Sequence, residues 1–454
     1  MQRKNRNFII FWIFAVIFLT GWYSYWQVKS NKEFGTISSV INFLPMDELK
    51  KAKFKTMASF AEYLFEKDGE EKTFMLMFQN NMELRPGGGY IGSFGILKMQ
   101  DGQVKQLQTH DLSNFDGRVP NGIVPPYPIK EALNVKDWKL RDSNWSPDFP
   151  TNAQKADEFY HLGQGQENFA GVIAINSNVL LSFLKVTGPV EIPGYPGTYD
   201  SENAVKNLEY QVEKGFYQQG LKIGERKGVM NLLASEIKKK VFDLNMRQKL
   251  QLAEIILDDL NRKDIQLYFK DENLESQAQR AQWDGGVDKN WAGDYLMLVD
   301  ANMGSLKSDY YLRRSFNYTI DLTGDVPKAD LKITYNHTAK EKDWMTKDYQ
   351  TYLRAYVPQS SWLVNSQNLG EQKFGDELGK KYFGSMFTVP LGRTKTVEFS
   401  YTLPKVTAEN YDLLIQRQSG SGAVTGQVTI IYKSQKKMMY EIDLSKDWKL
   451  SENQ

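Results

Sequence analysis

The chain has 454 residues, which is more than one compact core usually holds and is typical of two or three domains. Its 57 Lys and Arg residues nearly balance its 55 Asp and Glu residues, which excludes a global basic field, and we expect no nucleic-acid partner. The absence of cysteine excludes disulfides, thiol catalysis and cysteine-ligated zinc, and the three histidines are not spaced as a metal-ligand pair.

The N-terminus combines basic residues with a long uncharged run. The run extends from Phe8 to Val28, has aromatic residues at its distal end, and as a helix would span about 32 Å, roughly one bilayer core. A cleavable signal peptide is the alternative, but the run is bulky and no A-x-A-like site follows it. We therefore expect residues 1–30 to be a cytoplasmic basic tip and an uncleaved transmembrane anchor. By the positive-inside rule, the protein is then a single-pass cell-membrane protein whose bulk is extracytoplasmic.

Residues 31–70 are predicted to be a helical stalk or linker. Apolar residues recur every three to five positions from Leu49 to Leu64, which is an amphipathic helical pattern. Such a helix could also pack on the domain that follows.

Residues 71–304 are predicted to form an α/β domain with a mixed sheet and flanking helices. Its first strand is the apolar run 73–80, and a hairpin follows around Asp101-Gly102. After a loop-rich stretch, Thr151 is expected to begin a helix, and a buried strand over 169–176 precedes a helix that ends at Gly188. Helical patterns occupy 201–260, and 294–302 is predicted to be the last strand of this domain.

Residues 305–454 alternate apolar and polar residues in several runs separated by turns. Val397, Phe399 and Tyr401 fall on one face of such a run, as do Val428 and Ile430. The pattern predicts a C-terminal all-β sandwich.

The stretch NNMELRPGGGYIGSFG, residues 80–95, is the first candidate site. Arg85 precedes Gly87, Gly88 and Gly89, but no Walker lysine follows, and a strand rather than a helix comes next, so both common nucleotide-binding loops are excluded. Two interpretations are left. The glycines could form an anion-binding nest with Arg85 as a clamp, or they could form a turn that uses positive φ angles.

The stretch LRDSNWSPDFP, residues 140–150, is the second candidate. Arg141, Asp142, Asn144 and Asp148 lie close together in a predicted loop, where two carboxylates could bind a divalent cation or transfer protons. Alternatively, the aspartates cap local turns and Arg141 pairs with one of them.

The end of the hairpin adds one more residue to these candidates. His110 and Asp111 point to opposite faces of a strand, so we expect no catalytic dyad, although Asp111 alone could face the glycine loop. No confident metal site and no cofactor are expected, except a divalent cation if the protein is an enzyme.

These motifs resemble a known bacterial family. The segments QNNMELRPGGGYIGSFG, LRDSNWSPDFP, FAGVIAINSNVLLSFLKVTGPVEI and DYLMLVDANMGSLKSDYYLRRS are similar to the family called domain of unknown function 4012, over about residues 40 to 435. The resemblance implies a membrane-anchored bacterial surface protein with no established activity.

The layout is also similar, more distantly, to the LytR-CpsA-Psr envelope family. Members of that family are single-pass proteins with an extracellular α/β domain, and they transfer lipid-pyrophosphate-linked glycans to the cell wall. Arg85 matches the arginine of that family's glycine-containing loop, and His110-Asp111 takes the place of its Arg-Asp pair. The chain departs from the family at Gly92-Ser93, where an aspartate is expected.

Two functions follow as hypotheses. The first is an envelope protein that binds a cell-wall or surface glycan, or another partner, without catalysis. The second is an envelope glycan phosphotransferase, or a protein that binds polyprenyl pyrophosphate, with Arg85, Asp111, Arg141 and Asp148 around one cleft.

Overall fold

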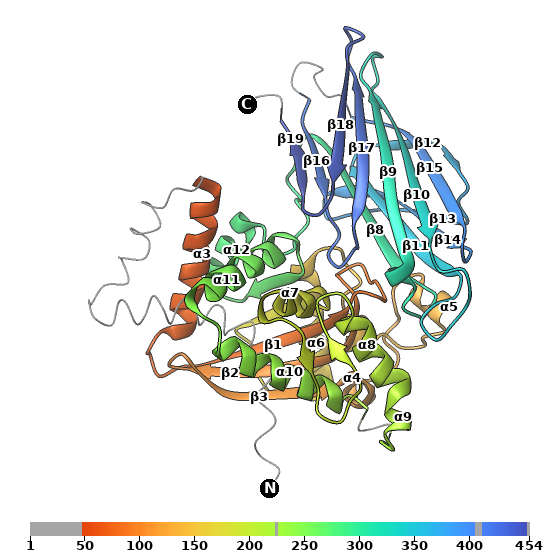
Figure 1. Ribbon diagram of the computed structural model, residues 1–454. Coiled ribbons are helices and arrows are strands. Elements are labelled where there is room, and N and C mark those ends of the chain that lie inside the picture. Colours follow the sequence, from red (N-terminus) through yellow and green to blue (C-terminus); the bar gives the residue numbers. More distant parts are fainter. Residues whose placement is uncertain (1–47, 223–225, 405–410, 452–454) are drawn as a thin grey trace. The chain divides into compact units, whose positions relative to one another are not determined.

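The computed structural model describes residues 48–222, 226–404 and 411–451 (Figure 1). The chain divides into two compact units that are interleaved along the sequence. The first unit comprises the described residues up to Phe78, Gly92–Phe115 and Gly165–Asp284, and the second comprises Gln79–Ile91, Asp116–Gln164 and the residues from Gly285 onward. The fold is therefore mixed α/β, with several sheets and many strands.

The first unit is built on a five-stranded sheet with the order β3-β2-β1-β4-β7. Its strands are β1 (Glu71–Asn80), β2 (Tyr90–Gln100), β3 (Gln103–Asp111), β4 (Gly171–Asn176) and β7 (Ile265–Phe269), and β5 (Val190–Glu191) pairs separately with β6 (Thr198–Tyr199). The predicted hairpin is confirmed, because Asp101 and Gly102 both have positive φ and join β2 to β3 as an antiparallel pair.

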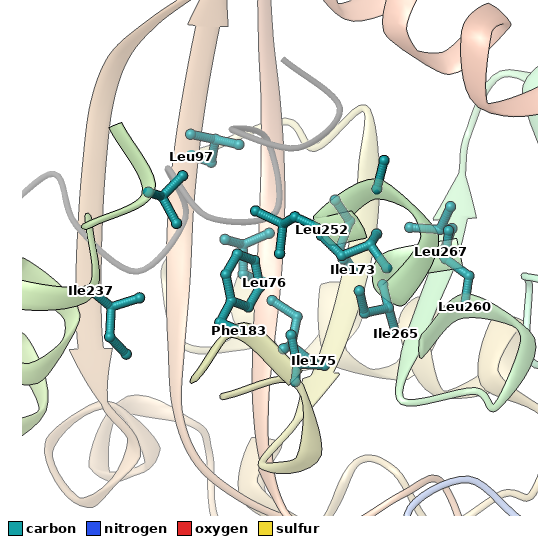
Figure 2. Packing of buried hydrophobic residues seen from close by; sticks show 14 of the residues in the cluster. Leu76, Leu97, Ile173, Ile175, Phe183, Ile237, Leu252, Leu260, Ile265 and Leu267 are labelled. Atoms are coloured by element: carbon teal, nitrogen blue, oxygen red, sulfur yellow. The ribbon is translucent and has the colours of Figure 1, made fainter. Parts of the chain in front are cut away.

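The first unit also contains helices, which except for α4 (Leu112–Phe115) and α9 (Phe216–Gln218) bury apolar side chains in one core with this sheet. The helices that do so are α3 (Glu48–Phe65), α7 (Asn178–Thr187), α8 (Ala204–Tyr210), the π-helical turn Gln211–Gly215, α10 (Gly228–Phe242), α11 (Met246–Asn261) and α12 (Glu272–Ala281). Figure 2 shows Leu76, Ile173 and Ile265 from the sheet among side chains of α7, α10 and α11. As predicted, α7 ends at Gly188, whose φ is 75°.

Helix α3 is packed on its domain and does not stand free as a stalk. The Phe60 ring lies 4.9 Å from the Phe269 ring of β7 and 6.2 Å from the Trp283 ring, measured between centroids. Met57 and Leu64 of the same helix face are also buried. The amphipathic pattern therefore supplies one wall of the first unit's core.

The second unit contains two six-stranded sheets, with the orders β12-β15-β10-β9-β17-β18 and β13-β14-β11-β8-β16-β19. The strands are β8 (Asp294–Asn302), β9 (Leu312–Asp321), β10 (Lys328–His337), β11 (Tyr349–Pro358), β12 (Trp362–Gln367), β13 (Gln372–Glu377), β14 (Lys380–Val389), β15 (Thr394–Thr402), β16 (Leu413–Gln416), β17 (Val424–Ile431), β18 (Lys437–Asp443) and β19 (Trp448–Leu450). Inward residues of both sheets form one core, where the Phe383 ring of β14 lies 6.1 Å from the Phe399 ring of β15.

Two details of the second unit differ from the sequence prediction. Strand β8 does not close the α/β domain, because it pairs with β11 and, in parallel, with β16 inside a sheet of the second unit. Helix α6 (Phe149–Leu162) begins before Thr151, and Pro150 stands in its first turn, where the missing N–H costs nothing. The short helices η1 (Asp116–Arg118), α5 (Ile129–Leu133), η2 (Leu140–Asp142) and η5 (Ser308–Tyr311) complete this unit.

The predicted anchor, Phe8 to Val28, lies outside the described residues. Among the residues that the structure does describe, no helix has the length and apolar character needed to cross a bilayer.

Candidate functional site

The second unit brings the two candidate loops together. The N–H of Gly87 donates to the carbonyl oxygen of Asn144 at 3.0 Å, and the side-chain amide of Asn144 donates to the carbonyl oxygen of Gly89 at 2.6 Å. Asn144 is fully buried between the loops. Segments that are about 55 residues apart in the sequence thus form one local structure.

The glycine loop is a tightly packed turn that leads into β2. A Cβ atom on Gly87 would stand 2.4 Å from Nδ2 of Asn152, and one on Gly89 would stand 2.6 Å from the backbone carbonyl group of Asn80. The Gly88 N–H donates to the carbonyl oxygen of Arg85 at 3.0 Å, so two glycine amides already serve the protein itself. These contacts favour the interpretation as a turn over the interpretation as an anion nest.

Arg85 is buried among acceptors of its own chain. Its guanidinium donates to Glu83 Oε1 at 3.0 Å and to the carbonyl oxygen of Asn302 at 3.0 Å, and its Nε lies 3.5 Å from Asp142 Oδ1. The last distance is that of an ionic contact rather than a hydrogen bond. Although burial opposes the charge, Glu83 and Asp142 together raise the pKa of Arg85 above its usual value, so this cation is held and neutralised internally.

Arg141 forms a further ion pair of the cluster. Its Nε donates to Oδ2 of Asp116, a carboxylate that is almost fully buried, whereas the Arg141 side chain is one-third exposed. Burial raises the pKa of Asp142, and Arg85 and Arg141 act against that rise. Burial likewise raises the pKa of Asp116 despite its partner Arg141.

Glu83 and Asp116 were not predicted as members of this cluster. Glu83 stands two residues before Arg85, so its position in the sequence could have indicated that it belongs to the cluster. Asp116 is 25 residues from Arg141 and lies in η1, and no sequence pattern links the two.

Several buried polar atoms of this cluster have no hydrogen-bond partner among the described residues. They are Arg85 Nε, Asp116 Oδ1, Asp142 Oδ1, Ser143 Oγ and Asn144 Oδ1. A buried polar atom without a partner costs about 1–3 kcal/mol, and native proteins usually satisfy such atoms with water, an ion or a ligand. The cluster therefore joins the two loops and is a candidate site for a polar ligand.

Asp148 connects the start of α6 to the segment that follows residue 285. Its carboxylate accepts from the Thr151 hydroxyl at 2.6 Å and from the Val287 N–H at 3.0 Å, and Lys289 Nζ lies 3.2 Å away. Asp148 is 1% exposed. These contacts match the alternative in which this aspartate organises local turns.

Asp111 belongs to the first unit and has partners there. Its Oδ2 lies 2.7 Å from Nζ of Lys227 at the start of α10, and Oδ1 accepts from the Ser113 hydroxyl at 2.8 Å. Burial would raise the pKa of Asp111, but Lys227 and Ser113 lower it below its usual value. The His110 ring instead stacks on Phe94, with 4.8 Å between ring centroids.

No group of three or more His, Cys, Asp or Glu side chains that could hold a metal ion occurs within residues 48–222, 226–404 and 411–451. If a divalent cation bound beside Arg85, Asp116 and Asp142 would supply two carboxylate ligands. Ser143 and Asn144 would supply neutral oxygen ligands.

Comparison with protein families gives one match. Residues 69–212 match the model of a family described as protein of unknown function, DUF4012. This confirms the expected resemblance for those residues, which are a shorter stretch than the expected 40 to 435. No curated protein matches the sequence.

Solved structures give remote likenesses. A Legionella pneumophila protein described as a candidate nutrient-binding protein is 9% identical over 35% of this chain and 70% of its own, with a TM-score of 0.24. A Listeria innocua protein is 11% identical over 48% and 80%, with a TM-score of 0.26. A Streptococcus agalactiae protein is 12% identical over 48% and 75%, with a TM-score of 0.28. Scores this low support no argument about fold or function.

Proposed function

We propose that this chain is a single-pass, membrane-anchored extracytoplasmic protein of the bacterial cell envelope that binds a cell-wall or surface glycan without catalysis. The anchor is the uncharged run from Phe8 to Val28, preceded by basic residues. The glycan-binding surface is the edge formed by strands β12 and β13.

The observation that supports binding is the exposure of three large apolar side chains on these two edge strands. Trp362 is 72% exposed, Val364 66% and Phe374 56%. Strands β12 and β13 are each the outermost strand of a sheet. A large apolar side chain that is exposed on an edge strand can serve as an anchor for a ligand.

The chemistry around Trp362 suits a sugar. Lys381 Nζ lies 5.7 Å from the centre of the Trp362 ring and 3.2 Å from a carboxylate oxygen of Asp376. A sugar ring has an apolar C–H face that stacks on indole and hydroxyl groups that bond to neighbouring charged side chains. This edge supplies both kinds of contact.

The shape of β12 favours recognition by side chains over the addition of another strand. Its pairing with β15 shifts register between Leu363 and Asn365, which leaves Val364 as a bulge. Bulges and charged residues on an edge strand hinder pairing with a further strand. A polymer would therefore contact the aromatic side chains rather than extend the sheet.

The charge cluster around Arg85 supports binding over catalysis. Arg85 is 2% exposed and already contacts two carboxylates, and Arg141 is paired with Asp116. An arginine that clamps a substrate pyrophosphate needs guanidinium N–H groups that face the substrate.

The test is binding of the full chain, in detergent, to purified cell-wall polysaccharide, measured by calorimetry. Trp362→Ala with Phe374→Ala should weaken binding by about tenfold or more, as expected for two lost contacts of about 1 kcal/mol each. Tyr217→Ala is the matched control, because Tyr217 is 69% exposed in the first unit. Equal affinity of both variants for the polysaccharide would contradict the proposal.

The anchor and its orientation have a separate test. Protease added to intact spheroplasts should digest the chain, because its bulk is expected outside the membrane. Full protection would refute this orientation.

The unpartnered polar atoms beside Arg85 favour a second candidate function. Ser143 Oγ, Asn144 Oδ1 and Asp142 Oδ1 could serve a bound pyrophosphate together with a divalent cation, as an envelope glycan phosphotransferase would require. Calorimetry of the unaltered chain with a polyprenyl pyrophosphate and Mg²⁺ tests this directly, and an absence of binding would eliminate it.

A further inference from the structure

The corner between helices α10 and α11 concentrates positive charge beside exposed apolar side chains. Between residues 232 and 250 there are five basic and two acidic residues, whereas the whole chain is nearly neutral. Phe242 at the end of α10 is 52% exposed, and Leu250 in the second turn of α11 is 57% exposed. Isolated exposed apolar residues are common, but two within a basic segment are typical of membrane-surface contacts.

Basic residues lie close to both apolar residues in the sequence, and one of them contacts Phe242. Lys238 Nζ lies 5.9 Å from the centre of the Phe242 ring, and Arg247 is exposed one turn before Leu250 on α11. Lys239 is 65% exposed and has one carboxylate partner, Glu236. Positive charge therefore exceeds negative charge at this corner, which complements a surface of anionic headgroups.

The distance from the expected anchor allows this corner to reach a membrane. Nineteen residues, 29–47, separate the uncharged run from α3, and a chain of that length spans at most about 65 Å. Lys53 of α3 donates to Asn261 at the far end of α11, and α11 is about 24 Å long from its 16 residues. Residues 29–47 are therefore long enough to let the α10–α11 corner reach the bilayer that holds the expected anchor.

We propose that the α10–α11 corner rests on the anionic phospholipid surface of the membrane in which the chain is anchored, with Phe242 and Leu250 in the headgroup layer. This inference depends on the anchor proposed above. It gives the first unit a second membrane contact, and it assigns a role to basic residues that the glycan-binding proposal does not use.

The absence of native cysteine allows a single-site test. The full chain with Leu250→Cys, labelled with an environment-sensitive fluorophore, is reconstituted in phosphatidylcholine vesicles with or without phosphatidylglycerol. We expect the emission to shift to shorter wavelength only when phosphatidylglycerol is present. A label at exposed Thr109 of β3 serves as the reference site and should show no shift.

Charge-reversal variants identify the cause of the shift. Lys239→Glu with Arg247→Glu should abolish it, whereas Lys105→Glu with Lys185→Glu, at exposed positions elsewhere in the first unit, should leave it unchanged. Identical emission in both kinds of vesicle would overturn the inference while the anchor proposal stands. If the chain does not float with phosphatidylcholine vesicles at all, the anchor proposal fails, and this inference fails with it.

Discussion

Removing Arg85 distinguishes a structural arginine from one reserved for a ligand. In the variant Arg85→Ala, the carboxylates of Glu83 and Asp142 lose the cation that they share, and the carbonyl oxygen of Asn302 loses a donor at 3.0 Å. Because Asp142 is 3% exposed, solvent cannot replace that partner. Breaking a buried ion pair by removing one side costs about 3–5 kcal/mol.

The assay is hydrogen–deuterium exchange of the full chain, read on peptides that cover residues 80–95 and 140–150, together with the urea midpoint. We expect the free energy of opening in these peptides to fall by about 3–5 kcal/mol. Arg226→Ala is the control, because its ion pair with Glu213 is 3.4 Å long and partly exposed, and such pairs contribute about 0–1 kcal/mol. A loss below about 1 kcal/mol in Arg85→Ala would refute the structural role.

Three further predictions concern other parts of the fold. Burial and the neighbouring Asp264 carboxylate raise the pKa of Asp259 to about 7, so folding favours the protonated form of Asp259. The free energy of unfolding should therefore fall as the pH rises from about 4 to 7. Asp259→Asn should flatten this part of a plot of Tm against pH. Gly87→Ala should destabilise the second unit by about 1–3 kcal/mol, because the added Cβ would overpack against Asn152. Gly92→Ala is the control and should not destabilise the protein, because a Cβ at Gly92 meets open space. Equal urea midpoints for the two variants would contradict this difference. Phe60→Ala should cost about 3–5 kcal/mol in urea unfolding, because this fully buried ring fills the core between α3 and β7; an unchanged midpoint would mean that α3 does not support the first unit.

Local patterns were sufficient for most individual elements. The Asp101-Gly102 turn, the fully buried strand β4 and the alternating strands β15 and β17 are all present where the sequence predicts them. Each depends on residues that are neighbours along the chain, such as turn residues with positive φ or side chains of period two.

Tertiary structure alone decided which strands and charges meet. Strand β8 is apolar and follows the helices of the first unit, so its sequence does not show that it pairs with β16, about 120 residues later. Likewise, the sequence shows Arg85, Asp142 and Arg141 as charged residues of two loops. The burial of Arg85 with Asp142 and the ion pair of Arg141 with Asp116 depend on tertiary packing. Composition and periodicity determine local conformation and the burial of one face, whereas long-range pairing and the pKa of a buried carboxylate depend on neighbours that only the folded chain brings together.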